Sequence, residues 1–464
     1  MKWCWTLQAF LPWVPAPKIE GGDPLSTLAI AGFIMVIVFM YLIMSKRMSA
    51  MTALILIPLL FAVGMGFSGM AKFADIGKWA LAGVRQVAPT GIMICFAILF
   101  FGIMIDAGLF DPLIKKILEL VHGDPLKVSV GTAVLAAIIS LDGDGSTTYM
   151  VTCSAMLAVH QRLGMDPLIL PSVAVMQNSV MNIIPWGGPT GRVLAALKVE
   201  SADVFTPLIP GMVLGSLWVC FVAYRWGLKE RARLGVTKLD NSEIAAKVTV
   251  SEDPEADKLR RPDRFLANLG LTSALMVALM AGVLPLSILF MIGTAFALML
   301  NYPSLKAQQA RIVANGANAM PVVAMVFAAG IFMGIMGGSK MVDAMAKTLI
   351  DAIPASMGPH MSFISAFLSL PGTFFLTNDA YYFGVLPVLA KAAAVYGISP
   401  EEMGRAALIG QGAHLLSPLV PSTYLLVGLN KVEFGDLQKY CLLPAIGISM
   451  VWLATAVALG FIRV

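Results

Sequence analysis

Long apolar segments separated by short polar stretches dominate the chain from residue 25 to its end. A helix needs about 20 mainly apolar residues to cross a bilayer. Ten segments approach or exceed that length: Leu25–Met44, Ser49–Phe67, Gly91–Leu109, Leu168–Leu197 (interrupted), Pro207–Trp226, Leu266–Leu284, Leu286–Leu300, Met320–Gly338, Met403–Leu429 (interrupted) and Cys441–Ile462. The pattern therefore predicts an all-α polytopic membrane protein.

Two further apolar regions break near their middles. Val128–His160 and Met361–Tyr396 each turn at a polar sequence, which leaves halves too short for two comfortable crossings. We expect both to be re-entrant hairpins that enter and leave the membrane on one side.

The composition excludes a soluble globule. The chain is 58% hydrophobic and only 13% charged, whereas soluble domains are about 25% charged. The net charge of +5 is too diffuse for nucleic acid and fits Lys and Arg on cytoplasmic loops. The five cysteines are scattered without zinc-ligand spacing, so we expect no resident cofactor.

One long polar stretch, residues 227–264, is expected to be a cytoplasmic linker between the halves 25–226 and 265–464. Residues 1–24 suit an interfacial segment. The halves repeat, because Gly145 and Asn378 in the hairpins lie 233 residues apart, as do Pro185 and Pro418 in the interrupted spans. We predict five spans and one hairpin per half. Because five is an odd number, the second half starts on the opposite side of the membrane and is inverted relative to the first. Such inverted repeats are typical of secondary transporters.

The distribution of basic residues predicts the orientation. If both termini lie outside, most of the 32 Lys and Arg residues fall on the inside, as the positive-inside rule requires. The expected loop holding Lys72, Lys78 and Arg85 is the exception. We therefore predict that both termini lie outside.

The first hairpin turns at the sequence LDGDGSTT, residues 141–148. Asp142 and Asp144 offer hard oxygens suited to a cation or a proton. Ser146, Thr147 and Thr148 begin the returning helix, whose N-terminus attracts anions. Such groups are costly at membrane depth without a ligand. The alternative is an ordinary surface turn with an N-capping Ser.

The second hairpin turns at FLTNDAYYFG, residues 375–384. Thr377, Asn378 and Asp379 lie where a helix restarts, so they are either ligands or caps only. Tyr381 and Tyr382 offer hydroxyl groups one turn further on, or belong to an aromatic belt at the membrane interface.

The first interrupted span contains NIIPWGGPTGR, residues 182–192, which cannot stay helical through two prolines and three glycines. Its freed carbonyl groups are candidate cation ligands, and Thr190 and Arg192 face the same region. Arg192 would bind carboxylates in a bidentate fork, or else extend its charged end to the outer interface.

The second interrupted span breaks similarly at HLLSPLVPST, residues 414–423, where Ser417, Ser422 and Thr423 are polar. His414 is either a proton carrier or a hydrogen-bonded helix residue. Asp106, near the end of its span, is interpreted as structural.

The charges of these groups indicate the cargo. Asp142, Asp144 and Asp379, against one guanidinium group, would repel a bare polycarboxylate because desolvated like charges are costly. Such a site suits a cation, a protonated group or an anion that arrives with its own divalent metal.

The segments LDGDGSTTYM, NIIPWGGPTGRV, LTNDAYYFGVLP and HLLSPLVPSTYLLVG together resemble the citrate–metal–proton symporter family (CitMHS) of the ion transporter superfamily. The resemblance implies import of citrate complexed with a divalent cation of the Mg²⁺ or Ca²⁺ class, coupled to protons. It also implies a homodimer in the bacterial cytoplasmic (inner) membrane that works by an elevator motion. The hairpin tips differ from the Ser-Asn-Thr tips of sodium-coupled relatives, which fits a proton-coupled symporter of metal–citrate.

The resemblance and the residue chemistry together give one hypothesis for the site. Asp142, Asp144 and Asp379 would handle the metal, and Asp144, Asp379 and His414 the protons. Citrate would be bound by Gly145, Ser146, Thr147, Thr148, Gly187, Gly188, Thr190, Arg192, Thr377, Asn378, Ser417, Ser422 and Thr423.

Other functions stay open on the sequence. A proton-coupled symporter of another carboxylate, such as a dicarboxylate or gluconate, would ignore divalent metal. An ion channel or a cation antiporter belongs to a different class, and a channel would not need duplicated broken hairpins. The chain has no HExxH, GxSxG or cofactor-binding loop, so an enzyme is not expected, although an intramembrane aspartate pair could be proteolytic.

Overall fold

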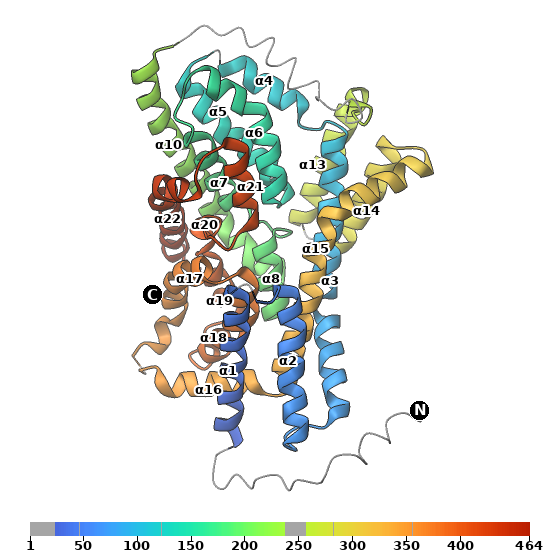
Figure 1. Ribbon diagram of the computed structural model, residues 1–464, viewed down its shortest axis with the longest axis vertical. Helices are drawn as coiled ribbons and strands as arrows, with labels where there is room; N and C mark the ends of the chain where they lie inside the picture. Colours follow the sequence, from blue (N-terminus) through green and yellow to red (C-terminus); the bar gives the residue numbers. More distant parts are fainter. Residues whose placement is uncertain (1–23, 46, 122, 237–256, 282, 355) are drawn as a thin grey trace.

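The computed structural model describes residues 24–45, 47–121, 123–236, 257–281, 283–354 and 356–464. All regular secondary structure in these residues is helical, which confirms the predicted all-α class. The molecule is elongated, and several helices run along its long axis (Figure 1).

The longer helices follow a similar order in the two halves of the chain, whereas short elements such as α9, η2 and η4 occur in one half only. The first half contains α1 (Pro24–Met44), α2 (Ala50–Phe67), α3 (Phe73–Asp106), α4 (Asp111–Val121), α5 (Pro125–Ile139), the 3-10 helix η1 (Ser140–Asp142), α6 (Gly145–Arg162), α7 (Ile169–Met181), α8 (Gly188–Leu197), α9 (Ser201–Phe205), η2 (Thr206–Leu208) and α10 (Ile209–Leu234). The second half contains η3 (Pro262–Arg264), α13 (Phe265–Ala281), α14 (Leu286–Asn301), α15 (Leu305–Gly338), α16 (Met341–Ala352), η4 (Gly358–His360), α17 (Met361–Phe375), the π-helix η5 (Ala380–Val385), α18 (Leu386–Ala394), α19 (Pro400–Leu408), α20 (Gln411–His414), α21 (Pro421–Asn430) and α22 (Phe434–Ala458).

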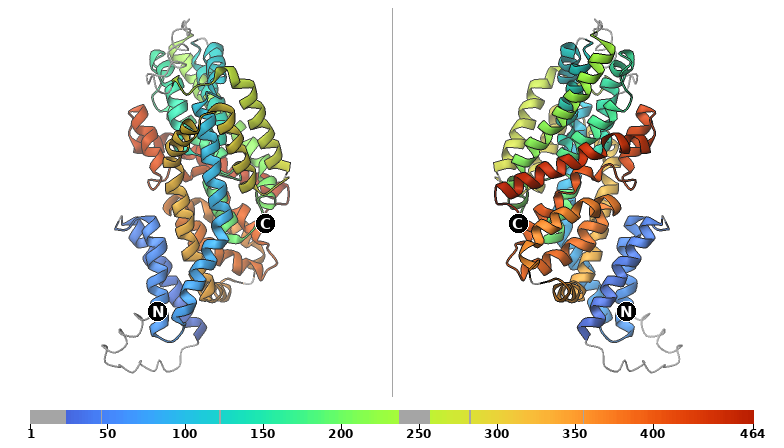
Figure 2. Two further views of the ribbon diagram at one scale, coloured as in Figure 1. Left: turned by 90° about the vertical axis from the view of Figure 1, so that its right-hand side faces the viewer. Right: turned by 90° about the vertical axis from the view of Figure 1, so that its left-hand side faces the viewer.

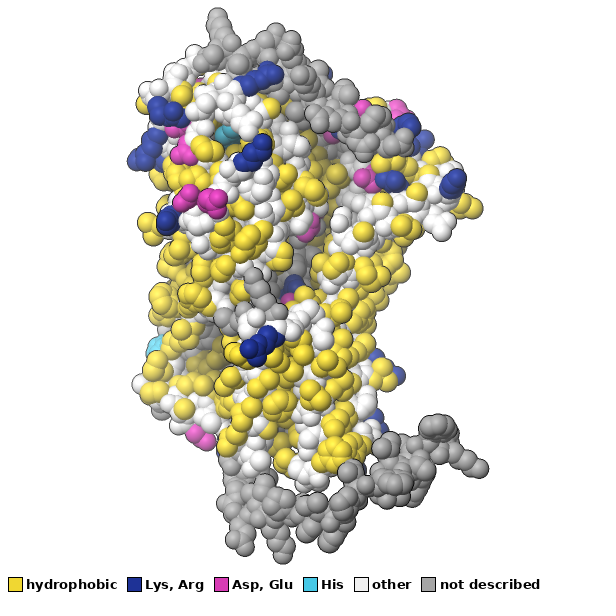
Figure 3. Space-filling view, in the orientation of Figure 1, with side chains coloured by type: hydrophobic (Ala, Val, Ile, Leu, Met, Phe, Trp, Pro, Cys, Tyr) yellow, Lys and Arg dark blue, Asp and Glu magenta, His cyan; other side chains and the backbone are white. Residues whose placement is uncertain are grey.

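Each predicted span corresponds to a helix, or to helices on either side of a break. Six of the described helical segments are long and apolar enough to cross a membrane: Ala50–Phe67, Phe73–Asp106, Pro125–Asp142, Ser201–Leu234, Leu305–Gly338 and Phe434–Ala458. Hydrophobic side chains cover the middle of the face in Figure 3, and Lys and Arg gather mainly near its upper end. The last of these segments, α22, runs obliquely across one side of the molecule (Figure 2).

The two longest helices, α3 and α15, exceed the spans predicted within them. Each has 34 residues and is therefore about 51 Å long at 1.5 Å per residue. The prediction of a loop around Lys72, Lys78 and Arg85 was wrong, because α3 begins at Phe73 and includes the last two residues. Lys78 lies on the exposed side of the helix and pairs with Asp75, so the charge does not interrupt the helix.

α3 and α15 pack against each other through glycines. A Cβ atom on Gly83 would collide with the carbonyl oxygen of Gly330, and one on Gly334 would collide with the carbonyl oxygen of Trp79. Small residues allow helix backbones to approach closely in membranes, where packing rather than the hydrophobic effect holds helices together. The glycines therefore set the distance between these two helices.

The two predicted hairpins turn where the sequence indicates, but the first arm, Pro125–Asp142, is long and apolar enough to cross a membrane, so the expectation that both halves are too short is wrong for this arm. α5 packs against α6 across η1, and α17 and α18 flank the π-helix η5. The interrupted spans are α7 followed by α8, and α19 and α20 followed by α21. These hairpins and breaks bring polar residues into the interior of a protein whose surface is largely apolar.

The structure describes both ends of the predicted linker (residues 227–264), namely residues 227–236 and 257–264. α10 continues to Leu234, and buried Glu230 accepts a hydrogen bond from the backbone N–H of Asp166 at 2.9 Å. Arg260 pairs with Asp111 at 3.4 Å, which ties the end of this stretch to α4. Residues 237–256, and the predicted interfacial segment except Pro24, lie outside the described residues.

We expect Gly334→Ala to destabilise the protein, because overpacking costs about 1–3 kcal/mol. That loss exceeds the gain of about 1 kcal/mol in helix propensity. Gly316→Ala on the same helix has nothing within 4 Å of the new Cβ and should be neutral or stabilising. Thermal denaturation in detergent compares the two, and equal melting temperatures would contradict this account of the α3–α15 contact.

Candidate functional site

The hairpin tips and the helix breaks meet in the middle of the molecule. α6 of the first hairpin contacts α21, η5 of the second hairpin contacts α8, and α7 contacts α20. Figure 1 shows these short elements between the longer helices. Each hairpin therefore meets an interrupted helix from the other half of the chain.

The tip of the first hairpin holds two carboxylates. Asp144 caps α6 by accepting hydrogen bonds from the N–H of Thr147 at 2.8 Å and from its hydroxyl at 2.9 Å. Asp142 is only 5% exposed and accepts from the N–H of Asp144 at 2.9 Å. An ordinary surface turn capped by Ser is therefore wrong. Among the described residues, no cationic side chain pairs with either aspartate.

The tip of the second hairpin is built around amide and hydroxyl groups. Thr377 accepts a hydrogen bond from the N–H of Ala380 at 3.2 Å, so it caps the returning helix as Asp144 does in the first hairpin. The Nε2 of Gln411 donates to Oδ1 of Asn378 at 2.9 Å and to the hydroxyl of Tyr382 at 2.8 Å. Tyr382 and its neighbour Tyr381 are buried, which excludes an aromatic belt facing lipid headgroups.

A buried ion pair joins this second tip to the first half of the chain. Nε of Arg192 lies 2.8 Å from Oδ1 of Asp379, and the two side chains are 11% and 7% exposed. Nη1 of Arg192 also donates to the carbonyl of Gly188 at 3.0 Å. The guanidinium group therefore stays inside the molecule instead of extending to the outer interface.

Two threonines hold the helix breaks in shape. The hydroxyl of Thr190 donates to the carbonyl of Ile183 at 2.6 Å, and that of Thr423 donates to the carbonyl of Leu415. Gly187 needs to lack a side chain, because a Cβ atom there would collide with the carbonyl oxygen of Asn182. The hydroxyl protons of both threonines are thus committed to the backbone.

Several other predicted site residues are hydrogen-bonded to protein groups. Thr148 donates to the Ser140 hydroxyl at 3.1 Å, and Ser417 accepts from the N–H of Leu419 at 3.2 Å. His414 is buried, and its Nδ1 lies 2.5 Å from the carbonyl oxygen of Thr373. This contact fits a hydrogen-bonded helix histidine, and its role as a proton carrier stays a prediction.

Gly145, between Asp144 and the predicted ligand Ser146, lies directly against two side chains. A Cβ atom at Gly145 would be 2.9 Å from Nδ2 of Asn178 and 3.0 Å from Oγ of Ser422. Because Gly145 has no side chain, the Asn178 amide of α7 and the Ser422 hydroxyl of α21 can lie directly against the first tip.

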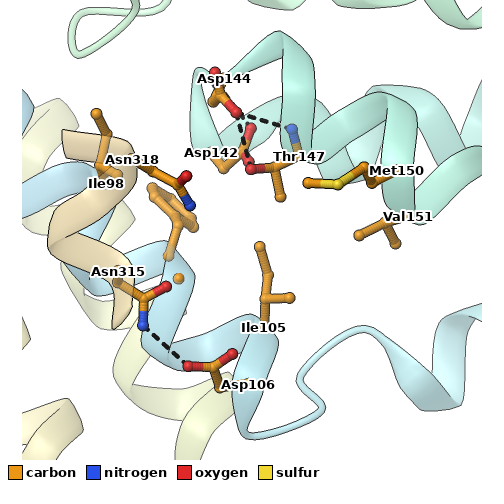
Figure 4. A pocket seen from close by; sticks show the side chains of 12 residues that line it. Ile98, Ile105, Asp106, Asp142, Asp144, Thr147, Met150, Val151, Asn315 and Asn318 are labelled. Carbon is orange, nitrogen blue, oxygen red and sulfur yellow. Dashed lines mark hydrogen bonds between the residues drawn. The ribbon is translucent and has the colours of Figure 1, made fainter. Parts of the chain in front are cut away.

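A cavity of about 200 Å³ lies where the first tip faces α3 and α15 (Figure 4). Asp142, Asp144 and Thr147 line one side, and Asp106 and Asn315 line the other. Asp106 accepts hydrogen bonds from Asn315 at 2.9 Å and from Arg311 at 3.3 Å. These bonds fit the structural role expected for Asp106, but its place at this cavity was not apparent from the sequence.

The structure separates the three predicted metal-binding aspartates. Asp142 and Asp144 share the first tip, whereas Asp379 is paired with Arg192. No group of three or more His, Cys, Asp or Glu residues that would hold a metal by itself occurs in the part of the chain that the structure describes. Any metal bound at the first tip would therefore need further ligands besides these two carboxylates.

Comparison with known proteins identifies the class. A family model described as citrate transporter (CitMHS) matches residues 39–410. A "Citrate transporter" of Bacillus subtilis (strain 168) is 58% identical over 94% of this chain and 99% of its own length. A "Mg(2+)/citrate complex secondary transporter" of the same organism is 48% identical, again over 94% and 99%.

The crystal structure of the Alcanivorax borkumensis YdaH transporter has a similar fold, with a TM-score of 0.57 and 16% identity, covering 82% of this chain and 87% of that one. The apolar helices and these relatives define a multi-pass membrane transporter. The chain belongs to the citrate transporter family.

Sequence reasoning missed two amides that the structure places at the hairpin tips. Asn178 lies against Gly145, and Gln411 donates to Asn378. A signal was present, because Asn178 and Gln411 are separated by the same 233 residues as the two tip residues that they contact.

We expect Arg192→Met alone to destabilise the protein by about 3–5 kcal/mol, because it leaves the Asp379 carboxylate buried without a partner. The double variant Arg192→Met, Asp379→Leu should recover most of this loss. The exposed pair Lys78–Asp75 is the control, since Lys78→Met should cost less than about 1 kcal/mol. Unfolding measured in detergent for all variants gives the comparison. Additive losses in the double variant would contradict a direct interaction.

Proposed function

We propose that this protein is a secondary active symporter that imports citrate as a complex with a divalent metal of the Mg²⁺ or Ca²⁺ class, together with protons. The observation that carries the proposal is the charge of the site. Arg192 is already paired with Asp379, and Arg311 with Asp106, while Asp142 and Asp144 have no cationic partner in the described chain. A bare citrate anion would be repelled there, whereas a metal–citrate complex brings the missing positive charge.

The metal in this proposal is cargo, and no resident cofactor is needed. Mg²⁺ is usually held by one or two carboxylates together with oxygens of the substrate and water. Asp142 and Asp144 fit that number, and citrate would complete the coordination. The name of the Bacillus subtilis Mg²⁺/citrate relative supports the same cargo.

Citrate would lie between the tips and the breaks. Ser146, Thr147, Asn378 and Arg192 would bind its carboxylates and hydroxyl, since they carry donor groups in this region. The remaining ligands in the proposal are Gly145, Thr148, Gly187, Gly188, Thr190, Thr377, Ser417, Ser422 and Thr423. Several of these, including Thr190 and Thr423, would act mainly by shaping the backbone around the substrate.

Asp144, Asp379 and His414 are the proposed proton-coupling residues. Protonation of Asp379 would remove its charge and free the Arg192 guanidinium group for a carboxylate of citrate. The geometry supports this step, because the pair is largely buried and joins two elements that meet at the site. Proton uptake would thus make the site more attractive to an anion.

The proposed mechanism is an elevator motion of the hairpins and interrupted helices against α3 and α15, in two inverted repeats. Equivalent hydrogen bonds support the repeat. The N–H of Thr147 donates to the Asp144 side chain at the first tip, and the N–H of Ala380 donates to the Thr377 side chain at the second. A second cavity, of about 440 Å³, lies between α3, α15, α16 and α18.

We further propose a homodimer in the bacterial inner membrane with both termini outside.

We expect proteoliposomes containing the purified protein to take up radiolabelled citrate only with Mg²⁺ or Ca²⁺ present, and faster when an imposed pH gradient drives protons inward. Collapse of the gradient with a protonophore should remove the acceleration. The Asp379→Asn variant should take up less citrate and lose the response to the gradient.

Uptake of equal rate in a chelator would contradict the metal–citrate cargo and favour another proton-coupled carboxylate symporter. Uptake that does not respond to the proton gradient in the unmodified protein would contradict proton coupling. Intact pH dependence in Asp379→Asn would remove that residue from the coupling mechanism.

A further inference from the structure

Two lysines end matching helices in an unfavourable backbone conformation. Lys198 directly follows α8 with φ 59° and ψ 45°, and Lys431 directly follows α21 with φ 55° and ψ 41°. They lie 233 residues apart, which is the separation of the matching tip residues Gly145 and Asn378. This left-handed conformation usually selects Gly or Asn at the end of a helix, because the Cβ atom of other residues is crowded there.

Neither lysine makes an interaction that would explain its presence. Among the described residues, Lys198 and Lys431 form no ion pair and no side-chain hydrogen bond. A cation is also favourable near the negative end of the helix dipole, but a lysine within the last turn would supply it without strain. Strained residues other than glycine tend to occur where function requires the side chain. The two positions therefore point to a use of the lysine charge.

Lys198 lines the cavity of about 440 Å³ between α3, α15, α16 and α18. A volume of this size is in the range of small-molecule binding sites. The other charged residues of the lining are Lys391 and Asp343, which pair with each other at 3.3 Å. Lys198 therefore supplies the uncompensated charge of this cavity, and that charge is positive.

The cavity borders the second hairpin tip. Phe383, a buried residue of the π-helix η5, belongs to the lining and lies four residues after Asp379. On the opposite wall, Lys198 lies six residues after Arg192, which corresponds to about 9 Å along a helix axis. An anion in the cavity would therefore lie next to the tip that holds the buried ion pair of Arg192 with Asp379.

We infer that this cavity binds the anionic substrate on its way to the second tip, and that Lys198 attracts the anion into it. A complex of citrate with a divalent cation is still an anion. A cation in a cleft with low-dielectric walls raises the local concentration of such a ligand. This inference rests on the proposed function for the identity of the substrate.

In this inference the two lysines serve opposite sides of the membrane. The cavity of Lys198 is bordered by α16, which packs against α1 in the lower part of Figure 1, whereas Lys431 ends α21, which packs against α6 in the upper part. Inverted repeats place equivalent residues on opposite sides. With both termini outside, as proposed, Lys198 would attract substrate from the outer solution and Lys431 from the inner one.

The test measures citrate exchange with Mg²⁺ present, in right-side-out and in inside-out membrane vesicles that contain the protein. At low ionic strength, we expect Lys198→Asn to raise the half-saturating citrate concentration about tenfold in right-side-out vesicles and to leave it unchanged in inside-out vesicles. Lys431→Asn should give the opposite pattern. Both differences from the unmodified protein should fade at about 1 M salt, where the Debye length is about 3 Å.

Lys198→Arg is the matched control, because it keeps the charge and should keep the half-saturating concentration of the unmodified protein. Asn and Gly both tolerate the left-handed conformation. We therefore expect neither Lys198→Asn nor Lys198→Gly to lower the melting temperature in detergent, and Lys198→Gly repeats the test if Lys198→Asn does not fold. Weaker binding without a loss of stability separates attraction of the anion from a structural role.

Three results would overturn the inference: an unchanged half-saturating concentration in Lys198→Asn, an equal change in both kinds of vesicle, or a change that salt does not reduce. The proposed function fails separately. Citrate exchange that needs no metal would refute the metal–citrate cargo, while the same comparison of variants would still support the inference, because free citrate is also an anion. If the unmodified protein exchanged no citrate, the proposed function and this inference would both be wrong.

Discussion

The ion pair between Arg192 and Asp379 determines the charge that the rest of the site presents. Removing two charges from water costs several kcal/mol for each ion, and only close, hydrogen-bonded contact repays it. The pair meets that requirement at 2.8 Å, and it uses the one Arg that lies deep in a predicted span. What remains at the first hairpin tip is a pair of carboxyl groups, Asp142 and Asp144, without a cationic partner in the described chain.

The interrupted helices bring polar groups of one half of the chain to the hairpin tip of the other half. Breaks in the interrupted helices bring Arg192 to the second tip and Ser422 to the first, so each tip contacts the other half of the chain. α3 and α15, held together by glycines, run past both groups as continuous helices. The broken elements carry the polar groups, and the unbroken pair packs beside them.

Much of this arrangement was predictable from the sequence. Long apolar segments identify the helices, and Pro, Gly and Asp within them identify the hairpin turns and the breaks. The N-terminal parts of α3 and α15, residues 73–90 and 305–319, were missed because charged residues such as Lys78, Arg85 and Lys306 on exposed helix surfaces keep a hydrophobicity criterion from detecting a span there. The short helices α4 and α16 have only 11 and 12 residues, which is too short for that criterion. The pairing of Arg192 with Asp379 joins residues 187 positions apart, and no local pattern reveals it.

Equilibrium binding of citrate to the purified protein in detergent, measured by calorimetry with Mg²⁺ or with a chelator, tests the charge argument most directly. It removes membrane, gradient and transport rate from the measurement and leaves only the fit between the site and its ligand. The account predicts saturable binding of citrate with Mg²⁺ and none detectable in the chelator. Equal affinity in both conditions would contradict it, because the site would then accept the bare anion despite Asp142 and Asp144.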